Sequence, residues 1–519
     1  MLQVLLVALF LQASQPYDIL ISNGTVVDGS GNPWFRADIA IRGDSIAAIG
    51  LLGNAPALRR IDARGLIVSP GFIDIHTHAR RGIFQDPNAR NYIRQGVTTL
   101  IEGNDGSSPI PLAPFFEKLA QSRIAVNFGS FAGQGSIRQQ VLGLENRKAT
   151  AAEISQMREL ARQAMLDGAF GLSTGLFYVP GNFTPTEEVV EIAKVVGAMG
   201  GMHISHMRDE AAGVLDSVRE TIRIGEEGGL PTQVTHHKII GKANWGRTVE
   251  TLRLVDEARA RGVDVTIDAY PYTASSTGLA ALFPQWSQAG GQKALVERLS
   301  APEQRARIKA AIVDNILTNR GGGDPKNVVI ASCSFNPNLA GKSLADITAD
   351  QGRAVTPENA AETAMELQQK GSCSAVYHAI DDRDVERVLR SPYTMIGSDG
   401  EVPVFGQGAP HPRSYGTFAR VLARYVRERK VLTLEDAIRK MSGYPAERLK
   451  LFDRGLLRPG MKADVVVFDP TTVRDKADFT TPHQYAEGFR YVIVNGHPII
   501  DAGKLTEQRP GRILYGPAK

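Results

Sequence analysis

The 519-residue sequence contains only two cysteines, Cys333 and Cys373, and no C-x-x-C pair. Two cysteines cannot supply a framework of disulfides, and without a C-x-x-C pair a thiolate-bound structural zinc is not expected. Any metal ion in this protein must therefore rest mainly on histidine and carboxylate ligands. Blocks of basic residues are missing as well, since the formal net charge is only +4 and Lys and Arg are scattered. Nucleic acid is therefore not an expected partner.

Long hydrophobic runs are also missing, so no stable membrane span is expected. The run from Val4 to Ala13 is too short to cross a bilayer, but it has the length of the apolar part of a signal peptide. No Lys or Arg precedes it, and Leu11 fits a cleavage site poorly, which leaves a buried N-terminal strand as the alternative. Residues 1–16 are a candidate signal peptide. If it is cleaved, the protein is periplasmic or secreted; otherwise it is cytoplasmic.

Both ends of the chain consist of short strand-like segments. In residues 17–68, alternating apolar runs are broken by Asn23-Gly24 and other Gly-rich turns, which is typical of β-hairpins. Residues 462–469 and 491–496 repeat this pattern after a long middle of different character. We therefore predict one small β-sandwich domain, composed of residues 17–69 and 456–519.

The middle of the chain alternates strand-like and amphipathic helical segments, such as residues 124–128, 152–167 and 171–174. Repeated β-α units predict a parallel sheet, and residues 70–455 are long enough for a closed (β/α)₈ TIM-like barrel. A doubly wound open sheet is the alternative. It would need a Gly-rich turn after the first strand, where this chain has His76-Thr77-His78. Residues 282–345 break the alternation and are predicted to be an insertion or lid over the barrel mouth.

Eight of the ten histidines lie in the predicted barrel, mostly at the ends of apolar runs. His76 and His78 are two positions apart, so both imidazoles lie on one face of a strand. His206 and His236 end two further runs, and Asp399 ends a fourth. The C-terminal ends of barrel strands converge on one site, whereas unrelated buried polar residues would have no reason to share this placement. These five residues predict a metal site.

Several motifs together resemble a known family. The string Pro70-Gly-Phe-Ile-Asp-Ile-His76-Thr-His78, followed by Gly397-Ser-Asp399, is similar to the amidohydrolase superfamily. Seven strings more specifically resemble the D-aminoacylase, or N-acyl-D-amino-acid deacylase, family: Gln95-Gly-Val-Thr-Thr, Gly171-Leu-Ser-Thr-Gly-Leu-Phe-Tyr178-Val-Pro-Gly181, His206-Met-Arg-Asp-Glu210, His236-His-Lys238, Asp268-Ala-Tyr-Pro-Tyr272, Gly397-Ser-Asp399-Gly400 and His411-Pro-Arg413. The resemblance extends from about Tyr17 to Leu514. It implies metal-dependent hydrolysis of the amide bond of N-acyl amino acids, in particular N-acyl-D-amino acids.

The resemblance also implies roles for individual residues. The metal ligands would be His76, His78, His206 and His236, holding one or two zinc ions. Asp399 would be the general base. The residues that hold the substrate carboxylate or polarise its amide carbonyl would be Lys238, Tyr178, one of Tyr270 or Tyr272, and, as a weaker candidate, Arg413.

The chain departs from the family at a metal ligand. Where the family typically has Gly-Asn-Cys-Gly, with a ligand cysteine, this chain has Gly103-Asn-Asp105-Gly106, preceded by Glu102. Asp105 is the first candidate to replace the cysteine, and Glu102 is the second. A carboxylate is an oxygen donor that zinc accepts and that can bridge two ions. Exchanging sulfur for oxygen also makes the site more compatible with Mn²⁺ or Fe²⁺. A second departure is Gln134, where relatives usually have histidine, and it bears on substrate preference.

Two other functions compete with deacylation. A dipeptidase or a cyclic-amide hydrolase could use the same barrel, but cyclic-amide relatives commonly carry a carboxylated lysine on the fourth strand, and residues 168–176 contain no lysine. A binding or scaffold protein on a decayed fold would be expected to have lost ligands, and all five are present here. A small-molecule substrate is the partner that these residues indicate.

Overall fold

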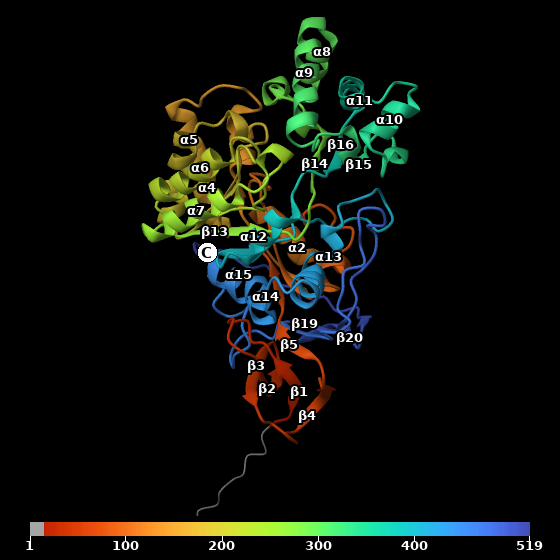
Figure 1. The fold of residues 1–519 in the computed structure, drawn as a ribbon. Coiled ribbons are helices and arrows are strands. Elements are labelled where there is room, and N and C mark those ends of the chain that lie inside the picture. Colours follow the sequence, from red (N-terminus) through yellow and green to blue (C-terminus); the bar gives the residue numbers. More distant parts are fainter. Residues whose placement is uncertain (1–14) are drawn as a thin grey trace, which may run out of the picture.

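The computed structural model describes residues 15–519 (Figure 1). The candidate signal peptide falls almost wholly in residues 1–14 and so lies outside the described residues. Within the described part, no helix is both long enough and apolar enough to cross a membrane.

Strands from both ends of the chain form one nine-stranded sheet, the β-sandwich part of the fold, seen at the bottom of Figure 1. The N-terminal segment supplies β1 (Tyr17–Val26), β2 (Phe35–Arg42), β3 (Ser45–Gly50), β4 (Ala57–Asp62) and β5 (Ile67–Pro70), and the C-terminal segment supplies β18 (Val465–Phe468), β19 (Phe489–Val494), β20 (His497–Asp501) and β21 (Lys504–Leu505). The two segments join where β18 pairs antiparallel with β5. The neighbouring strands follow the order β21-β20-β19-β18-β5-β1-β2-β3, and β4 pairs with β1.

Strand β18 shows how this sheet is attached to the rest of the protein. Successive side chains of a strand point to opposite faces. Val465 and Val467 belong to the core of the terminal sheet, whereas Val466 and Phe468 belong to the large core of the barrel. Both faces of β18 are thus buried, which explains why it is apolar at every position.

The predicted barrel is confirmed. Its strands, in chain order, are β6 (Phe72–Asp74), β7 (Val97–Glu102), β8 (Asn127–Ser130) with β9 (Ala132–Gly133), β10 (Gly171–Gly175), β11 (Met202–His206), β12 (Thr232–Val234), β13 (Val265–Ala269) and β17 (Thr394–Ile396). Only Phe131 separates β8 from β9, so they act as one strand that pairs with β7 on one side and β10 on the other. A parallel bridge between Thr77 and Gly400 and a hydrogen bond from Asp399 N to His76 O (2.8 Å) close the ring between β17 and β6. The eight strand positions form a closed parallel barrel.

Helices surround these strands. The described helices outside the insertion are α1 (Arg90–Ile93), α2 (Ala113–Ser122), α3 (Gln134–Leu142), α4 (Ala151–Asp167), α5 (Thr186–Ala198), α6 (Val214–Gly228), α7 (Thr248–Ala260), α12 (Asp382–Arg390), α13 (Arg413–Arg420), α14 (Leu434–Met441) and α15 (Gly443–Arg448). Helix α4 shows why they begin and end where they do. Thr150 and Glu153 form a capping box at its start, and Gly168 ends it with a φ of 112°. Its observed span matches the predicted helix over residues 152–167 closely.

The insertion is longer than the predicted range 282–345. It comprises β14 (Ser275–Gly278), α8 (Gly291–Ser300), α9 (Pro302–Thr318), β15 (Val328–Cys333), α10 (Leu344–Asp350), α11 (Pro357–Lys370) and β16 (Cys373–Tyr377). Strands β14 and β15 both pair antiparallel with β16, so the small sheet needs strands before and after the predicted range. The insertion has its own apolar core and lies above the barrel in Figure 1. A disulfide joins Cys333 to Cys373 across β15 and β16, which the sequence analysis did not predict.

Candidate metal centre

Six potential ligand side chains meet at the C-terminal mouth of the barrel. They come from the ends of five strands. His76 and His78 follow β6, Asp105 follows β7, His206 ends β11, His236 follows β12 and Asp399 follows β17. This is the face at which a closed barrel gathers residues that are far apart in the sequence.

The six side chains form two groups that share Asp105. One group consists of His76, His78, Asp105 and Asp399, and the other of Asp105, His206 and His236, with the ligand atoms of each group within 4.8 Å of one another. Asp105 Oδ1 lies 3.4 Å from His76 Nε2 and 3.3 Å from His236 Nε2. Asp105 Oδ2 lies 3.5 Å from both His78 Nε2 and His206 Nδ1. Each oxygen of the Asp105 carboxylate thus contacts one histidine from each group.

Several atoms of this cluster lack the hydrogen-bond partner that burial normally requires. His76 Nε2 and Asp105 Oδ1 are buried without a hydrogen-bond partner among the described residues. Asp105, His236 and Asp399 also have positive φ angles of 55°, 33° and 52°, which non-glycine residues seldom adopt. Such departures concentrate at functional sites, and nitrogen and oxygen donors around one buried point fit a divalent cation such as Zn²⁺.

The ionisation of the cluster differs between its histidines. In His76 and His78, burial lowers the pKa, but the neighbouring carboxylates outweigh burial and raise the pKa of both imidazoles. Burial lowers the pKa of His206 to about 4, so its imidazole is neutral, as a ligand must be. Burial raises the pKa of Asp105, but the imidazoles of His236 and His76 outweigh it and hold that pKa well below its usual value. In Asp399 burial is likewise outweighed, chiefly by the Arg413 guanidinium, which lies 2.7 Å from Oδ2 and lowers the pKa. Both carboxylates are therefore ionised at neutral pH.

Two further buried carboxylates contact the histidines from behind. Asp268 Oδ1 lies 3.2 Å from His76 Nδ1 and accepts a 2.7 Å hydrogen bond from the backbone N of His236. Glu210 Oε1 lies 3.4 Å from His236 Nδ1. Contacts of this kind hold an imidazole in the orientation and tautomer that a metal requires. The sequence analysis did not assign these roles, although both residues occur in the motifs quoted for the family, which was the available signal.

Lys238 lies behind the cluster rather than at its open side. Its ammonium pairs with Glu210 and lies 2.8 Å from His236 Nδ1. Arg320 NH2 contacts the same Glu210 at 3.3 Å. Lys238 is only 5% exposed and does not line the cavity described below. It does, however, lie 5.7 Å from the centre of the Tyr270 ring.

The structure separates the paired candidates left open by the sequence. Glu102 is fully buried but accepts a 3.0 Å hydrogen bond from the backbone N of Arg80, and it does not join either ligand group. The Tyr270 ring has Arg413 at 4.8 Å, and its buried hydroxyl has no partner among the described residues. The Tyr272 ring instead packs on His411 and Phe479, away from the ligand groups. Asp105 and Tyr270, and not Glu102 or Tyr272, are thus placed with the cluster.

A cavity of about 700 Å³ opens onto the cluster. Its lining includes His78, Asp105 and Asp399 from the ligand groups, together with Tyr178 and Arg413. Strands β14, β15 and β16 of the insertion supply another part of its lining. The cavity is large enough for a small-molecule substrate.

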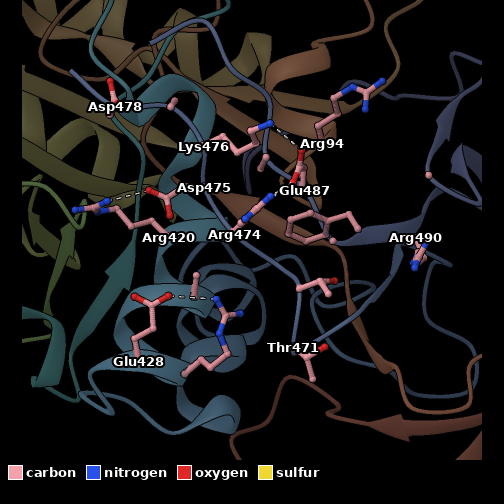
Figure 2. Close-up of a pocket in the computed structure, with 18 residues that line it drawn as sticks. Arg94, Arg420, Glu428, Thr471, Arg474, Asp475, Lys476, Asp478, Glu487 and Arg490 are labelled. Carbon is pink, nitrogen blue, oxygen red and sulfur yellow. Dashed lines mark hydrogen bonds and ion pairs between the residues drawn. The ribbon is translucent and has the colours of Figure 1, made fainter. Parts of the chain in front are cut away.

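A larger cavity, of about 1000 Å³, lies elsewhere, along α13 and residues 471–490 (Figure 2). Its charged side chains mostly pair with one another, as Arg420 does with Asp475 (2.9 Å) and Arg474 with Glu487 (2.8 Å). No histidine lines it. The size of a cavity therefore does not identify the active site in this protein. The ligand residues that line the smaller cavity do.

Comparison with known proteins agrees with this geometry. The model of the Amidohydrolase family matches residues 59–276 and 343–500. Three proteins of Alcaligenes xylosoxydans xylosoxydans are similar over 96% of the chain: a D-aminoacylase (38% identity, 98% of its length), an N-acyl-D-glutamate deacylase (37%, 96% of its length) and an N-acyl-D-aspartate deacylase (34%, 95% of its length).

Solved structures show the same similarity. An N-acyl-D-glutamate deacylase from Bordetella bronchiseptica, complexed with zinc and a phosphonate inhibitor, superimposes with a TM-score of 0.83 at 34% identity, over 97% of this chain and all of that one. A D-aminoacylase with a binuclear metal centre gives a TM-score of 0.82 at 37% identity, over 96% of this chain and all of that one.

The geometry predicts different metal binding for two isosteric substitutions. Asp105→Asn removes a charged donor that both groups share, so zinc affinity should fall by at least about 10-fold, because even contacts behind a ligand typically change affinity by roughly 10- to 100-fold. Glu102→Gln should bind zinc as the unaltered protein does. Zinc per chain is measured by elemental analysis after dialysis against graded concentrations of a chelator. An Asp105→Asn protein that retains zinc as firmly as the unaltered chain would show that Asp105 is not a ligand.

Proposed function

The chain belongs to the amidohydrolase family, and we propose that it hydrolyses the amide bond of N-acyl-D-amino acids, releasing a carboxylate and the free amino acid. The observation that carries this proposal is that the two ligand groups, which share the Asp105 carboxylate, and Arg413 lie beside one cavity. The similar proteins named above are deacylases of N-acyl-D-amino acids, which supports the same reaction and the same handedness here.

The residues present fit a metal centre of one or two zinc ions. His76, His78, Asp105 and Asp399 would hold one ion, and Asp105, His206 and His236 would hold the second. The carboxylates of Asp105 and Asp399 would also accommodate Mn²⁺ or Fe²⁺. When bound, the metal polarises the amide carbonyl and makes a water molecule acidic enough to attack it near neutral pH.

The substrate carboxylate would bind around Tyr270. Arg413 lines the cavity and lies 4.8 Å from the centre of the Tyr270 ring, and the Tyr270 hydroxyl has no hydrogen-bond partner among the described residues. Burial raises the pKa of Tyr270 well above its usual value, so the hydroxyl keeps its proton. A guanidinium and a neighbouring hydroxyl donor are suited to a carboxylate.

Asp399 would move the proton. Its carboxylate is ionised, lies 3.0 Å from His78 Nε2 and borders the cavity, so it can accept the proton of the attacking water and pass it to the leaving amine nitrogen. Tyr178 would stabilise the oxyanion. Its hydroxyl accepts a 3.1 Å hydrogen bond from Thr277 Oγ1, which leaves its own hydrogen available for the developing charge.

The competing hydrolase of cyclic amides gains no support from the site. Strand β10, the fourth of the barrel, contains no lysine that could become a carboxylated ligand. The structural similarity to D-hydantoinase, at 17% identity and a TM-score of 0.56, reflects the fold alone.

We also propose that the protein is exported to the periplasm or beyond. The disulfide between Cys333 and Cys373 is of a kind that persists in oxidising compartments and is rare in the cytosol. The apolar run in residues 4–13 is consistent with this destination. Fractionating the producing cells and mapping peptides without reduction should find the protein outside the cytoplasm with this disulfide formed. A cytoplasmic protein with both thiols free would contradict export.

The reaction is tested with paired N-acetyl-D- and N-acetyl-L-amino acids and the zinc-loaded protein. We expect release of acetate from the D-forms, loss of activity when a chelator removes zinc, and recovery when zinc is restored. Asp399→Asn should keep its zinc, because three donors of its group remain, while kcat falls by about 10² to 10⁴. Near-normal turnover by Asp399→Asn would exclude its role in proton transfer, and no turnover of any D-form would exclude deacylation.

Two tyrosines separated by one residue provide a matched test of carboxylate binding. Tyr270→Phe removes a donor to a charged group, which should lower kcat/KM by about 10- to 150-fold. Tyr272→Phe removes a hydroxyl that lies 3.5 Å from Pro412 O and should change kcat/KM little. The readout is the preference for an N-acetyl-D-amino acid over its C-terminal amide, which only Tyr270→Phe should reduce. Equal preferences in both variants would rule out Tyr270 as a carboxylate ligand.

A further inference from the structure

The insertion gives the active-site cavity a wall of hydroxyl groups. Six serine and threonine residues from its small sheet line the cavity: Ser276 and Thr277 on β14, Ser332 and the adjacent Ser334 at the end of β15, and Ser372 and Ser374 at the start of β16. Ser332 Oγ and Ser374 Oγ lie 2.8 Å apart, and Ser334 Oγ donates to Ser372 O at 3.2 Å. Between these pairs, the disulfide of Cys333 and Cys373 holds the two strands together.

The position of Arg413 relates this wall to the substrate. Arg413 NH2 donates a 3.2 Å hydrogen bond to Ser276 O on β14, so the proposed carboxylate site directly adjoins the small sheet. An amino acid carries its side chain on the same carbon as its carboxylate. A carboxylate held by Arg413 therefore brings the substrate side chain close to β14 and the strands paired with it.

The charge of the cavity argues against an acidic side chain. Among the described lining residues, the two with Arg or Lys side chains are Arg81 and Arg413. Arg413 is already assigned to the carboxylate that every N-acyl amino acid carries, so Arg81 is the other cation in the lining. Arg413 pairs with Asp399, and the exposed Arg81 lies 3.9 Å from Glu401. A second substrate carboxylate would need a cation of its own to offset its loss of water.

The lining of the cavity argues against a large apolar side chain. Its apolar groups are the small ones of Val179, Pro180, Ala331, Pro410 and the disulfide, and no Leu, Ile, Met, Phe or Trp lines it among the described residues. An apolar group against the wall would remove water from several hydroxyls without replacing their hydrogen bonds, which is unfavourable. The comparisons do not decide this point, since the relatives named above include D-aminoacylase, D-glutamate and D-aspartate deacylases at 34% to 38% identity.

We propose that this protein selects N-acyl-D-amino acids whose side chains are neutral and form hydrogen bonds, that is, hydroxyl or carboxamide side chains. The inference rests on the proposed function and adds the substrate class to it. Ser332 and Ser374 are the residues that would contact the side chain and determine the preference.

The test uses three substrates of similar length: N-acetyl-D-glutamine, N-acetyl-D-glutamate and N-acetyl-D-methionine. The kcat/KM for the glutamine substrate should exceed the other two by about 10-fold or more, since a site built for hydrogen bonds rejects analogues that lack them. Equal or faster hydrolysis of the glutamate or methionine substrate overturns the inference while the proposed function stands. If the zinc-loaded protein hydrolyses no N-acetyl-D-amino acid at all, the proposed function itself fails.

A gain of function tests the wall directly. Ser332 is exposed to the cavity, so Ser332→Arg should be tolerated and should supply the missing cation, raising the ratio of glutamate to glutamine hydrolysis by at least about 10-fold. Ser332→Gln controls for size. Ser300→Arg, at the end of α8 in the same insertion but outside the cavity lining, controls for charge. An unchanged ratio in Ser332→Arg, or an equal rise in Ser300→Arg, would show that the β15 serine does not contact the substrate side chain.

Discussion

The arrangement of side chains at the barrel mouth depends on one constraint, which is that several negatively charged carboxylates are buried there. Asp268, Glu210 and Asp399 are at most 6% exposed and the Asp105 side chain is 9% exposed, and a buried carboxylate is costly unless a cation or several donors accompany it. Lys238, Arg320 and Arg413 supply cationic partners for Glu210 and Asp399. Asp105 has only imidazoles around it, which are neutral when they act as ligands. A divalent cation at this point would satisfy both the Asp105 carboxylate and the unpartnered Nε2 of His76.

The barrel makes this concentration of charge compatible with a stable fold. Each ligand lies at the end of a short buried strand, and the strands themselves are held by backbone hydrogen bonds that do not depend on the site. Behind the ligands, Asp268 on β13 links its own strand to β6 and β12, because it contacts His76 and His236 and accepts from Gln233 at 2.6 Å. The terminal sheet is joined to the barrel by a similar buried contact. Asp464, just before β18, accepts from Asn127 Nδ2 of β8 at 3.1 Å and pairs with Arg454 at 2.5 Å.

The candidate metal ligands and the hydroxyl wall of the cavity come from different parts of the chain. The ligand groups and Tyr270 belong to the barrel, whereas β14, β15 and β16 of the insertion supply the hydroxyl wall. Since the insertion has its own apolar core and its own disulfide, its lining can differ between relatives without disturbing the ligands. This separation is consistent with the proposal that the insertion contacts the substrate side chain while the barrel supplies the ligands.

The sequence alone determined the barrel, the terminal β-sandwich and the positions where ligands occur, because these depend on local patterns. Apolar runs with a period of two and histidines at their ends are visible without the fold, as at His76 and His78.

Only the tertiary structure decided which neighbouring side chain enters the site. Asp105 does so because its backbone turns at a φ of 55°, while Glu102 points to Arg80 N. Likewise, Arg413 lies over the ring of Tyr270 and not over that of Tyr272, and Lys238 pairs with Glu210. Cys333 meets Cys373 across a sheet that extends beyond the predicted insertion. Such orientations follow from loop backbone angles and from contacts between residues far apart in the chain, which no local pattern encodes.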